Sequence, residues 1–171
     1  MLIFLIGFMG SGKTTLGRPL ATRLGYRFVD LDREIEQGEG RTIGEIFSTD
    51  GEAAFRALEG AYLQRVIEQG GDAVVSTGGG TPCFGEHMAE MNRSGVTVYL
   101  KLAPAVLVNR LLSAHLQRPL VAGKSPEELL VYITETLAER EVYYRRANVV
   151  VADPSRDVRR LVEILNPHLV G

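Results

Sequence analysis

Short apolar runs alternate with longer stretches of mixed polarity along almost the whole chain. The apolar runs lack strict alternation of apolar and polar residues, which is typical of strands buried on both faces of a parallel sheet. The longer stretches carry apolar residues at helical spacing; in residues 52–69, Phe55, Leu58, Tyr62 and Val66 fall near one face. Strands are therefore predicted at residues 2–7, 27–32, 73–79, 96–102 and 148–153.

Helix-terminus signals support this alternation. Gly25 is a predicted C-cap for a helix over Lys13–Leu24, and Thr42 and Glu45 have the spacing of a capping box. The pattern predicts a three-layer α/β domain with a mostly parallel sheet, whose ligands bind at the carboxyl ends of the strands. With no repeat or long linker, residues 1–171 are expected to form one domain. Further helices are predicted at residues 104–115, 126–146 and 155–166.

Composition and charge narrow the class of protein. The chain is 45% hydrophobic and 23% charged, with a formal net charge of −2, which argues against wholesale nucleic-acid binding. The single cysteine, Cys83, excludes an internal disulfide and is interpreted as inert. The apolar N-terminal run is far shorter than the roughly 20 residues of a membrane span and lacks the marks of a signal peptide. We therefore expect a cytoplasmic protein without membrane association.

The first chemical signal lies between the first predicted strand and the first predicted helix. Gly7 to Thr14 read GFMGSGKT, which matches the pattern G-x-x-x-x-G-K-[ST]. Lys13 is predicted to reach the β- and γ-phosphates of a nucleoside triphosphate, and the Thr14 hydroxyl to bind Mg²⁺. The pattern does not indicate the reaction. The residues expected to contact the nucleotide here are Gly10, Ser11, Gly12, Lys13, Thr14 and Thr15.

Two carboxylates, Asp30 and Asp32, lie at the end of the second predicted strand, at the sheet edge where the phosphate loop is expected. One carboxylate there could hold a metal through water, and another could accept a proton from an attacking hydroxyl. The alternative is that Asp32 only caps a helix beginning near Arg33.

An arginine and a glycine run are further candidates. Arg56 follows Glu52 by four residues and precedes Glu59 by three, a spacing that on its own favours a solvent-facing ion pair. Three consecutive glycines, 78–80, follow a buried strand at its carboxyl end. A plain turn rarely needs three, so a ligand contact through the backbone is favoured over a simple loop.

Taken in order, these motifs resemble the shikimate kinase family over nearly the whole chain. Several of them are specific on their own, so the ordered set is far stronger than the phosphate loop alone. The matching stretches are GFMGSGKTT (7–15), VDLD (29–32), GRTIGEIFSTDGEAAFRALE (40–59), STGGGTP (76–82), RPL (118–120) and LAEREVYYRRAN (137–148).

The resemblance implies a fold and a reaction. The fold is a five-stranded parallel sheet in the order 2-3-1-4-5, flanked by helices as in nucleoside monophosphate kinases. The reaction is transfer of the γ-phosphoryl of ATP to the 3-hydroxyl of shikimate, with Mg²⁺. A substrate-binding helical region over about 33–62 and a mobile lid over about 113–128 are implied. We expect a monomer whose partner is this small molecule.

The resemblance also assigns the acceptor end of the site. Asp32 is expected to contact the attacking hydroxyl and to serve as base. Arg56 and Arg140 are expected to clamp the shikimate carboxylate, since the planar guanidinium can donate two parallel hydrogen bonds. The residues expected to line the pocket beside them are Gly78, Gly79 and Gly80.

At the nucleotide end, the resemblance implies that Asp30 supports Mg²⁺ through water, alongside Thr14. Arg118 is expected to reach the transferring phosphoryl from the lid, which must also exclude water so that ATP is not simply hydrolysed. Arg110 is expected to stack on adenine, and Pro154 to pack against its other face.

Two other functions are alternatives to the phosphorylation of shikimate. A gluconate-type kinase also acts on a carboxylated substrate, although the triple glycine and the FRALE stretch count against it. A slow nucleotide switch is a different class of protein, and a guanine switch is expected to carry N-K-x-D, which does not occur. Tyr143 and Tyr144 are interpreted as packing residues.

Overall fold

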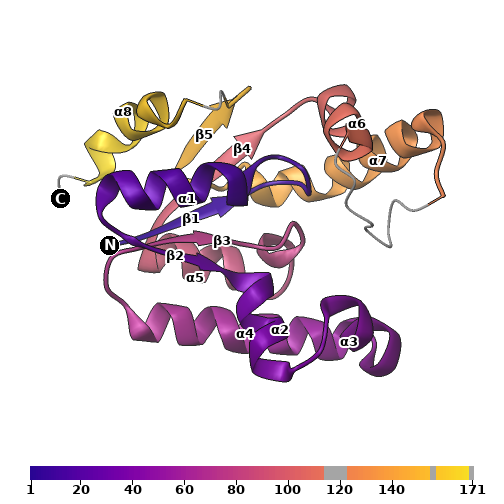
Figure 1. Ribbon diagram of the computed structural model, residues 1–171, viewed down its shortest axis with the longest axis horizontal. Coiled ribbons are helices and arrows are strands. Elements are labelled where there is room, and N and C mark those ends of the chain that lie inside the picture. Colours follow the sequence, from indigo (N-terminus) through magenta and orange to yellow (C-terminus); the bar gives the residue numbers. More distant parts are fainter. Residues whose placement is uncertain (114–122, 155–156, 170–171) are drawn as a thin grey trace.

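The computed structural model describes residues 1–113, 123–154 and 157–169. Its centre is a five-stranded sheet in the order β2-β3-β1-β4-β5, with every neighbouring pair parallel (Figure 1). This confirms the predicted α/β class and strand order. The strands are β1 (Leu2–Ile6), β2 (Arg27–Asp30), β3 (Ala73–Ser76), β4 (Gly95–Lys101) and β5 (Val149–Ala152).

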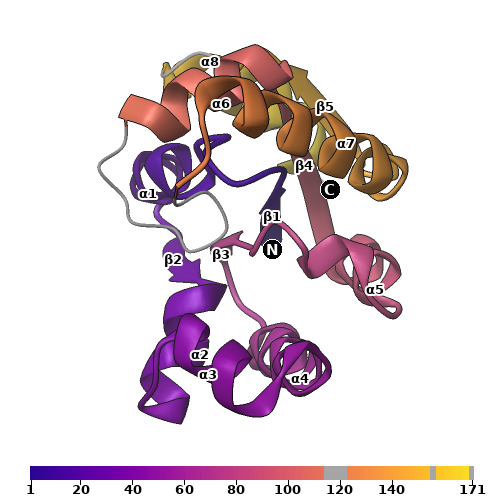
Figure 2. The ribbon, with the colours of Figure 1, turned by 90° about the vertical axis from the view of Figure 1, so that its right-hand side faces the viewer.

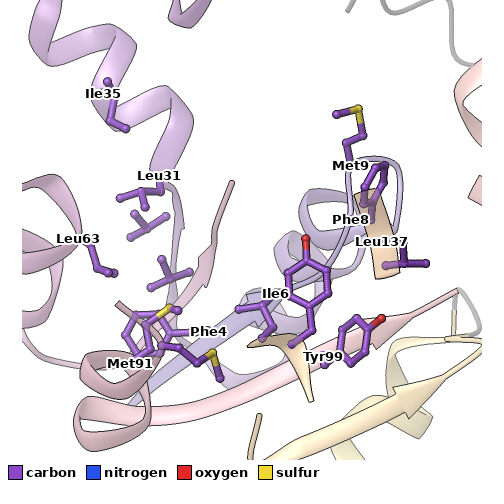
Figure 3. Packing of buried hydrophobic residues seen from close by; sticks show 14 of the residues in the cluster. Phe4, Ile6, Phe8, Met9, Leu31, Ile35, Leu63, Met91, Tyr99 and Leu137 are labelled. Carbon is purple, nitrogen blue, oxygen red and sulfur yellow. The ribbon is translucent and has the colours of Figure 1, made fainter. Parts of the chain in front are cut away.

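Side chains of β1 divide the core between the two faces of the sheet. Ile3 and Leu5 join a cluster with α1 and α8, whereas Phe4 and Ile6 join a larger cluster with α4, α5 and α7. Figure 3 shows Phe4 against Met91 in the second cluster and Ile6 beside Tyr99. Because both faces of the strand are covered, its sequence is continuously apolar rather than alternating.

Most helices lie where the sequence predicts them. The first helix, α1, ends at Leu24 as predicted. Gly25 follows it with φ 73°, and the Gly25 N–H donates to carbonyls of the last helical turn. The Thr42 capping box is present, with the Thr42 N–H donating to Glu45 Oε2 at 2.7 Å. The helices are α1 (Lys13–Leu24), α2 (Leu31–Glu39), α3 (Ile43–Asp50), α4 (Glu52–Gln69), α5 (His87–Ser94), α6 (Pro104–Ser113), α7 (Pro126–Tyr144) and α8 (Val158–Leu169), with a 3₁₀ turn η1 (Thr81–Cys83).

Three differences from the sequence prediction are local. Helix α5 and the turn η1 were not predicted, because the stretch between β3 and β4 is short and its apolar residues, Met88 and Met91, are few. Helix α8 runs from Val158 to Leu169 rather than over 155–166. Residues 126–128, at the predicted end of the lid, form the first turn of α7, whereas 114–122 lie outside the described residues.

The junction after β2 corrects one interpretation. The strand ends at Asp30, and α2 begins at Leu31 rather than near Arg33. Asp30 caps the helix by accepting the Arg33 N–H at 3.4 Å. Asp32 lies inside the first turn, so the interpretation of Asp32 as the cap is wrong.

The carboxyl ends of the strands lie between two groups of helices. Viewed towards that edge, α2, α3 and α4 gather near the β2 end of the sheet, and α6 and α7 gather near its β4–β5 end (Figure 2). The loops after β1 and β3 and the first turn of α2, which follows β2 directly, lie at this edge, where ligands of open α/β sheets bind. Within the described ranges, no helix is both long enough and apolar enough to span a membrane.

Candidate active site

The loop between β1 and α1 has the conformation that its glycines permit. Gly10 and Gly12 adopt φ 79° and 99°, values that favour glycine, and the loop leads directly into the N-terminus of α1. The Lys13 ammonium donates to the carbonyls of Gly7 at 2.7 Å and Phe8 at 3.0 Å. Loop amides and a helix N-terminus together form a site suited to an anion such as a phosphate group.

A cluster of oxygen ligands lies at the start of α1. The Thr14 hydroxyl donates to Asp30 Oδ2 at 3.1 Å and lies 3.2 Å from Ser76 Oγ. Asp30 and Ser76 are register partners on β2 and β3, which explains their proximity. Ser76 is a site residue that the sequence reasoning did not identify, since its place beside Thr14 depends on strand pairing.

These ligands suit Mg²⁺ rather than a metal held by a dense protein cage. In the described part of the chain, no group of three or more His, Cys, Asp or Glu side chains could hold a metal. Mg²⁺ commonly keeps several waters and binds through one or two carboxylates together with substrate phosphates. One carboxylate and two hydroxyls beside a phosphate loop fit that pattern.

Each glycine of the triple-glycine loop faces a different predicted substrate residue. A Cβ placed on Gly78 would lie 3.0 Å from Asp32 Oδ1, and one on Gly79 would lie 3.2 Å from Arg140 Nη1. A Cβ on Gly80 would lie 2.6 Å from Arg56 Nη2, closer than any real contact. The structure thus brings Asp32, Arg56 and Arg140 around one backbone surface, where any side chain would displace them.

Arg56 does not project into solvent, contrary to the interpretation that its spacing alone favours. Its side chain is 16% exposed. The guanidinium donates to Glu59 Oε2 at 2.9 Å and lies 3.5 Å from Glu52 Oε1. Its guanidinium lies 3.9 Å from the centre of the Phe84 ring. The helix face is covered by the segment after β3, which is distant in sequence.

Glu59 is a buried carboxylate whose two oxygens both have partners. It is 1% exposed; one oxygen accepts from Arg56 and the other accepts the Thr81 hydroxyl at 2.6 Å. Thr81 and Phe84 were missed by the sequence reasoning. The sequence of α4 did contain a signal for a buried polar site at Glu59. Glu59 falls on the same buried stripe as Phe55, and an acidic residue is unusual at such a position.

Arg110 lies against the phosphate loop, and Pro154 lies beside the first turn of α1. Arg110 Nη1 donates to the Ser11 carbonyl at 3.2 Å, so its side chain rests on the phosphate loop. Pro154 is buried near Leu16 at the end of β5. Arg118 lies outside the described residues.

Cys83 provides a test of the electrostatics near the acceptor site. Burial raises the pKa of its thiol to about 11, although Arg140 and Arg56 act in the opposite direction. A raised pKa leaves the unreactive thiol as the dominant form below about pH 11. We expect alkylation by iodoacetamide, followed by mass spectrometry, to be slow at pH 8 and to accelerate toward pH 11. Labelling at pH 8 as fast as that of free cysteine would contradict this.

The strand–phosphate loop–helix unit, with a carboxylate and two arginines gathered beside it around the triple glycine, defines a P-loop kinase of the small-molecule type. The family model for shikimate kinase matches residues 9–166. The chain therefore belongs to the shikimate kinase family.

Relatives and solved structures of shikimate kinases match this chain over nearly its full length. A shikimate kinase of Bacteroides fragilis is 47% identical over 177 residues, covering 99% of this chain and 98% of the relative. The crystal structure of shikimate kinase from Bacteroides thetaiotaomicron has a TM-score of 0.92 at 42% identity, covering 97% of this chain and 98% of that one. The structure of shikimate kinase from Acinetobacter baumannii in complex with shikimate has a TM-score of 0.86 at 31% identity. The match covers 99% of this chain and 95% of that one.

Proposed function

We propose that the protein transfers the γ-phosphoryl of ATP to the 3-hydroxyl of shikimate, producing shikimate 3-phosphate and ADP. The observation that carries the proposal is the convergence of Asp32, Arg56 and Arg140 on the triple glycine beside the phosphate loop. The relative from Acinetobacter baumannii was solved with shikimate, which supports the same acceptor here.

Recognition of the substrate carboxylate falls to Arg56 and Arg140. A guanidinium can meet a carboxylate with two parallel hydrogen bonds, and Glu59 holds Arg56 in place before the substrate arrives. Arg56 Nε is buried and has no hydrogen-bond partner among the described residues. A buried donor left unmet is costly, so an acceptor from a bound carboxylate would relieve it.

The chemistry requires a base, positioned phosphates and charge stabilisation. Asp32 accepts the proton of the 3-hydroxyl as that oxygen forms its bond to the γ-phosphorus and the bond to ADP breaks. Lys13 leaves its loop carbonyls to contact the β- and γ-phosphates. Thr14 and, through water, Asp30 would hold Mg²⁺, which neutralises charge on the phosphate oxygens.

Further roles are proposed with these. Gly10, Ser11, Gly12 and Thr15 contact the phosphates, while Arg110 stacks on adenine with Pro154 on the other face. Arg118 reaches the transferring phosphoryl from a lid between α6 and α7. The lone cysteine fits a cytoplasmic enzyme. Asp32, Arg56 and Arg140 meet around the triple glycine within one chain, which supports a monomer.

ADP release by the purified protein tests the proposal against its rival. With ATP and Mg²⁺, we expect ADP release that depends on shikimate, little release with gluconate, and almost none without an acceptor. Chelation of Mg²⁺ by EDTA should abolish the signal. Release that depends on gluconate but not on shikimate would favour the gluconate-type alternative and overturn the assignment.

A further inference from the structure

Helix α7 brings two side chains to the triple glycine, of which the proposed clamp uses only one. Arg140 faces Gly79, and one turn further along the same helix the Tyr144 hydroxyl donates to the Gly79 carbonyl at 2.5 Å. Tyr144 is fully buried and lies at the last position of α7. The interpretation of Tyr144 as a packing residue alone therefore omits a hydrogen bond to the pocket.

The position of this hydroxyl is fixed from a second element. The Tyr144 ring packs on Tyr99 of β4, with the ring centres 5.0 Å apart and the planes tilted by 38°. Burial raises the pKa of the Tyr144 phenol above its ordinary value, so the group stays protonated and available as a donor. Strand β4 and helix α7 thus hold one donor against the Gly79 carbonyl.

Gly79 lies where the two halves of the proposed site meet. A Cβ placed on it would lie 3.2 Å from Arg140 Nη1, 3.4 Å from the Met9 nitrogen and 3.6 Å from the Gly7 oxygen. Glycine has more backbone freedom than any other residue, so a run of three needs external contacts to hold one conformation. Around Gly79, the Tyr144 hydroxyl supplies such a contact.

We propose that the Tyr144 hydroxyl is a positioning group that fixes the Gly79 peptide and, with it, the surface on which Arg140 meets the substrate carboxylate. The inference rests on the proposed function, since it assumes that this carboxylate is that of shikimate. Tyr144 does not touch the reacting atoms. Without the Tyr144 hydroxyl, the Gly79 backbone regains conformational freedom, which substrate binding must then remove.

Tyr144→Phe tests this while keeping the ring and its contact with Tyr99. We expect the KM for shikimate to rise about five- to thirty-fold, the cost of ordering about one residue's backbone. The KM for ATP should change less than about twofold, because hydrogen bonds within the phosphate loop remain.

Tyr99→Phe is the matched control. It also removes one buried phenol from the same ring pair, but the polar group that acts on the Tyr99 hydroxyl is Glu141, not the glycine loop. We expect it to leave both KM values within about twofold of wild type. If Tyr144→Phe keeps a wild-type KM for shikimate, or if both variants raise both KM values alike, the hydroxyl has no positioning role and the inference is wrong.

Hydrogen exchange of residues 78–81 gives a readout that does not require turnover. We expect faster amide exchange in this segment for Tyr144→Phe than for Tyr99→Phe, with exchange in β1 unchanged. Unchanged exchange at 78–81 would overturn the inference even if the kinetics shifted. Failure of the proposed function can be told apart from failure of this inference. In the first case, the wild-type protein would release no ADP in response to shikimate. The exchange experiment would still report on the contact between Tyr144 and Gly79.

Discussion

Replacing Arg56 by alanine is expected to lower kcat/KM for shikimate by at least about 100-fold, because two charge-assisted hydrogen bonds to the carboxylate are lost. ATP affinity should change less than about twofold, since Arg56 lies against Gly80 and the phosphate loop is held by its own contacts. Steady-state kinetics with each substrate varied, together with calorimetric ATP binding, measure both effects.

The Arg56→Ala variant needs a control for stability. It leaves the Glu59 carboxylate buried with Thr81 as its remaining hydrogen-bond partner among the described residues, which costs about 3–5 kcal/mol. The double variant R56A/E59Q removes that charge and should recover much of the thermal stability without recovering use of shikimate.

Arg41→Ala is the matched surface control for this prediction. Arg41 lies just before α3, and its partly exposed side chain pairs with Asp50 at 2.7 Å. It should leave both substrates unaffected. Loss of ATP affinity with retained shikimate affinity in Arg56→Ala would show that Arg56 belongs to the nucleotide end, contrary to the proposed role.

Replacing Asp32 by asparagine is expected to lower kcat by about 10²- to 10⁴-fold while the protein stays folded. The amide is nearly the same shape but does not accept the proton of the attacking hydroxyl. Because Asp30 rather than Asp32 caps α2, the helix keeps its cap and the melting temperature should change little.

Glu34→Gln is the control for Asp32→Asn. It neutralises another acid in the first turn of α2, at an exposed position. Kinetics, thermal melting and shikimate binding by calorimetry together separate catalysis from folding and recognition. Near-normal turnover in Asp32→Asn would remove Asp32 as the base.

The local parts of this structure could be read from the sequence because short-range chemistry determines them. The phosphate loop is specified by glycines at fixed spacing between an apolar strand and a helix. The Thr42–Glu45 capping box and the Gly25 C-cap are likewise set by neighbouring residues. The continuous apolar character of β1 indicated a strand covered on both faces, and the core bears this out.

The parts that escaped sequence reasoning depend on contacts between distant segments. Spacing on α4 placed Arg56 near two acids but could not show that Phe84 covers its guanidinium. Ser76 reaches Thr14 only because β3 lies between β2 and β1 in the sheet. The bond from Tyr144 to Gly79 likewise joins residues 65 positions apart.

The most direct test of the central claim is to identify the phosphorylated product. The purified protein should be incubated with ATP, Mg²⁺ and shikimate, and the product examined by phosphorus–proton correlation NMR. We expect a new phosphate monoester coupled to the proton on carbon 3 of shikimate, formed in step with ADP. Phosphate attached elsewhere, or ADP accompanied only by inorganic phosphate, would contradict it.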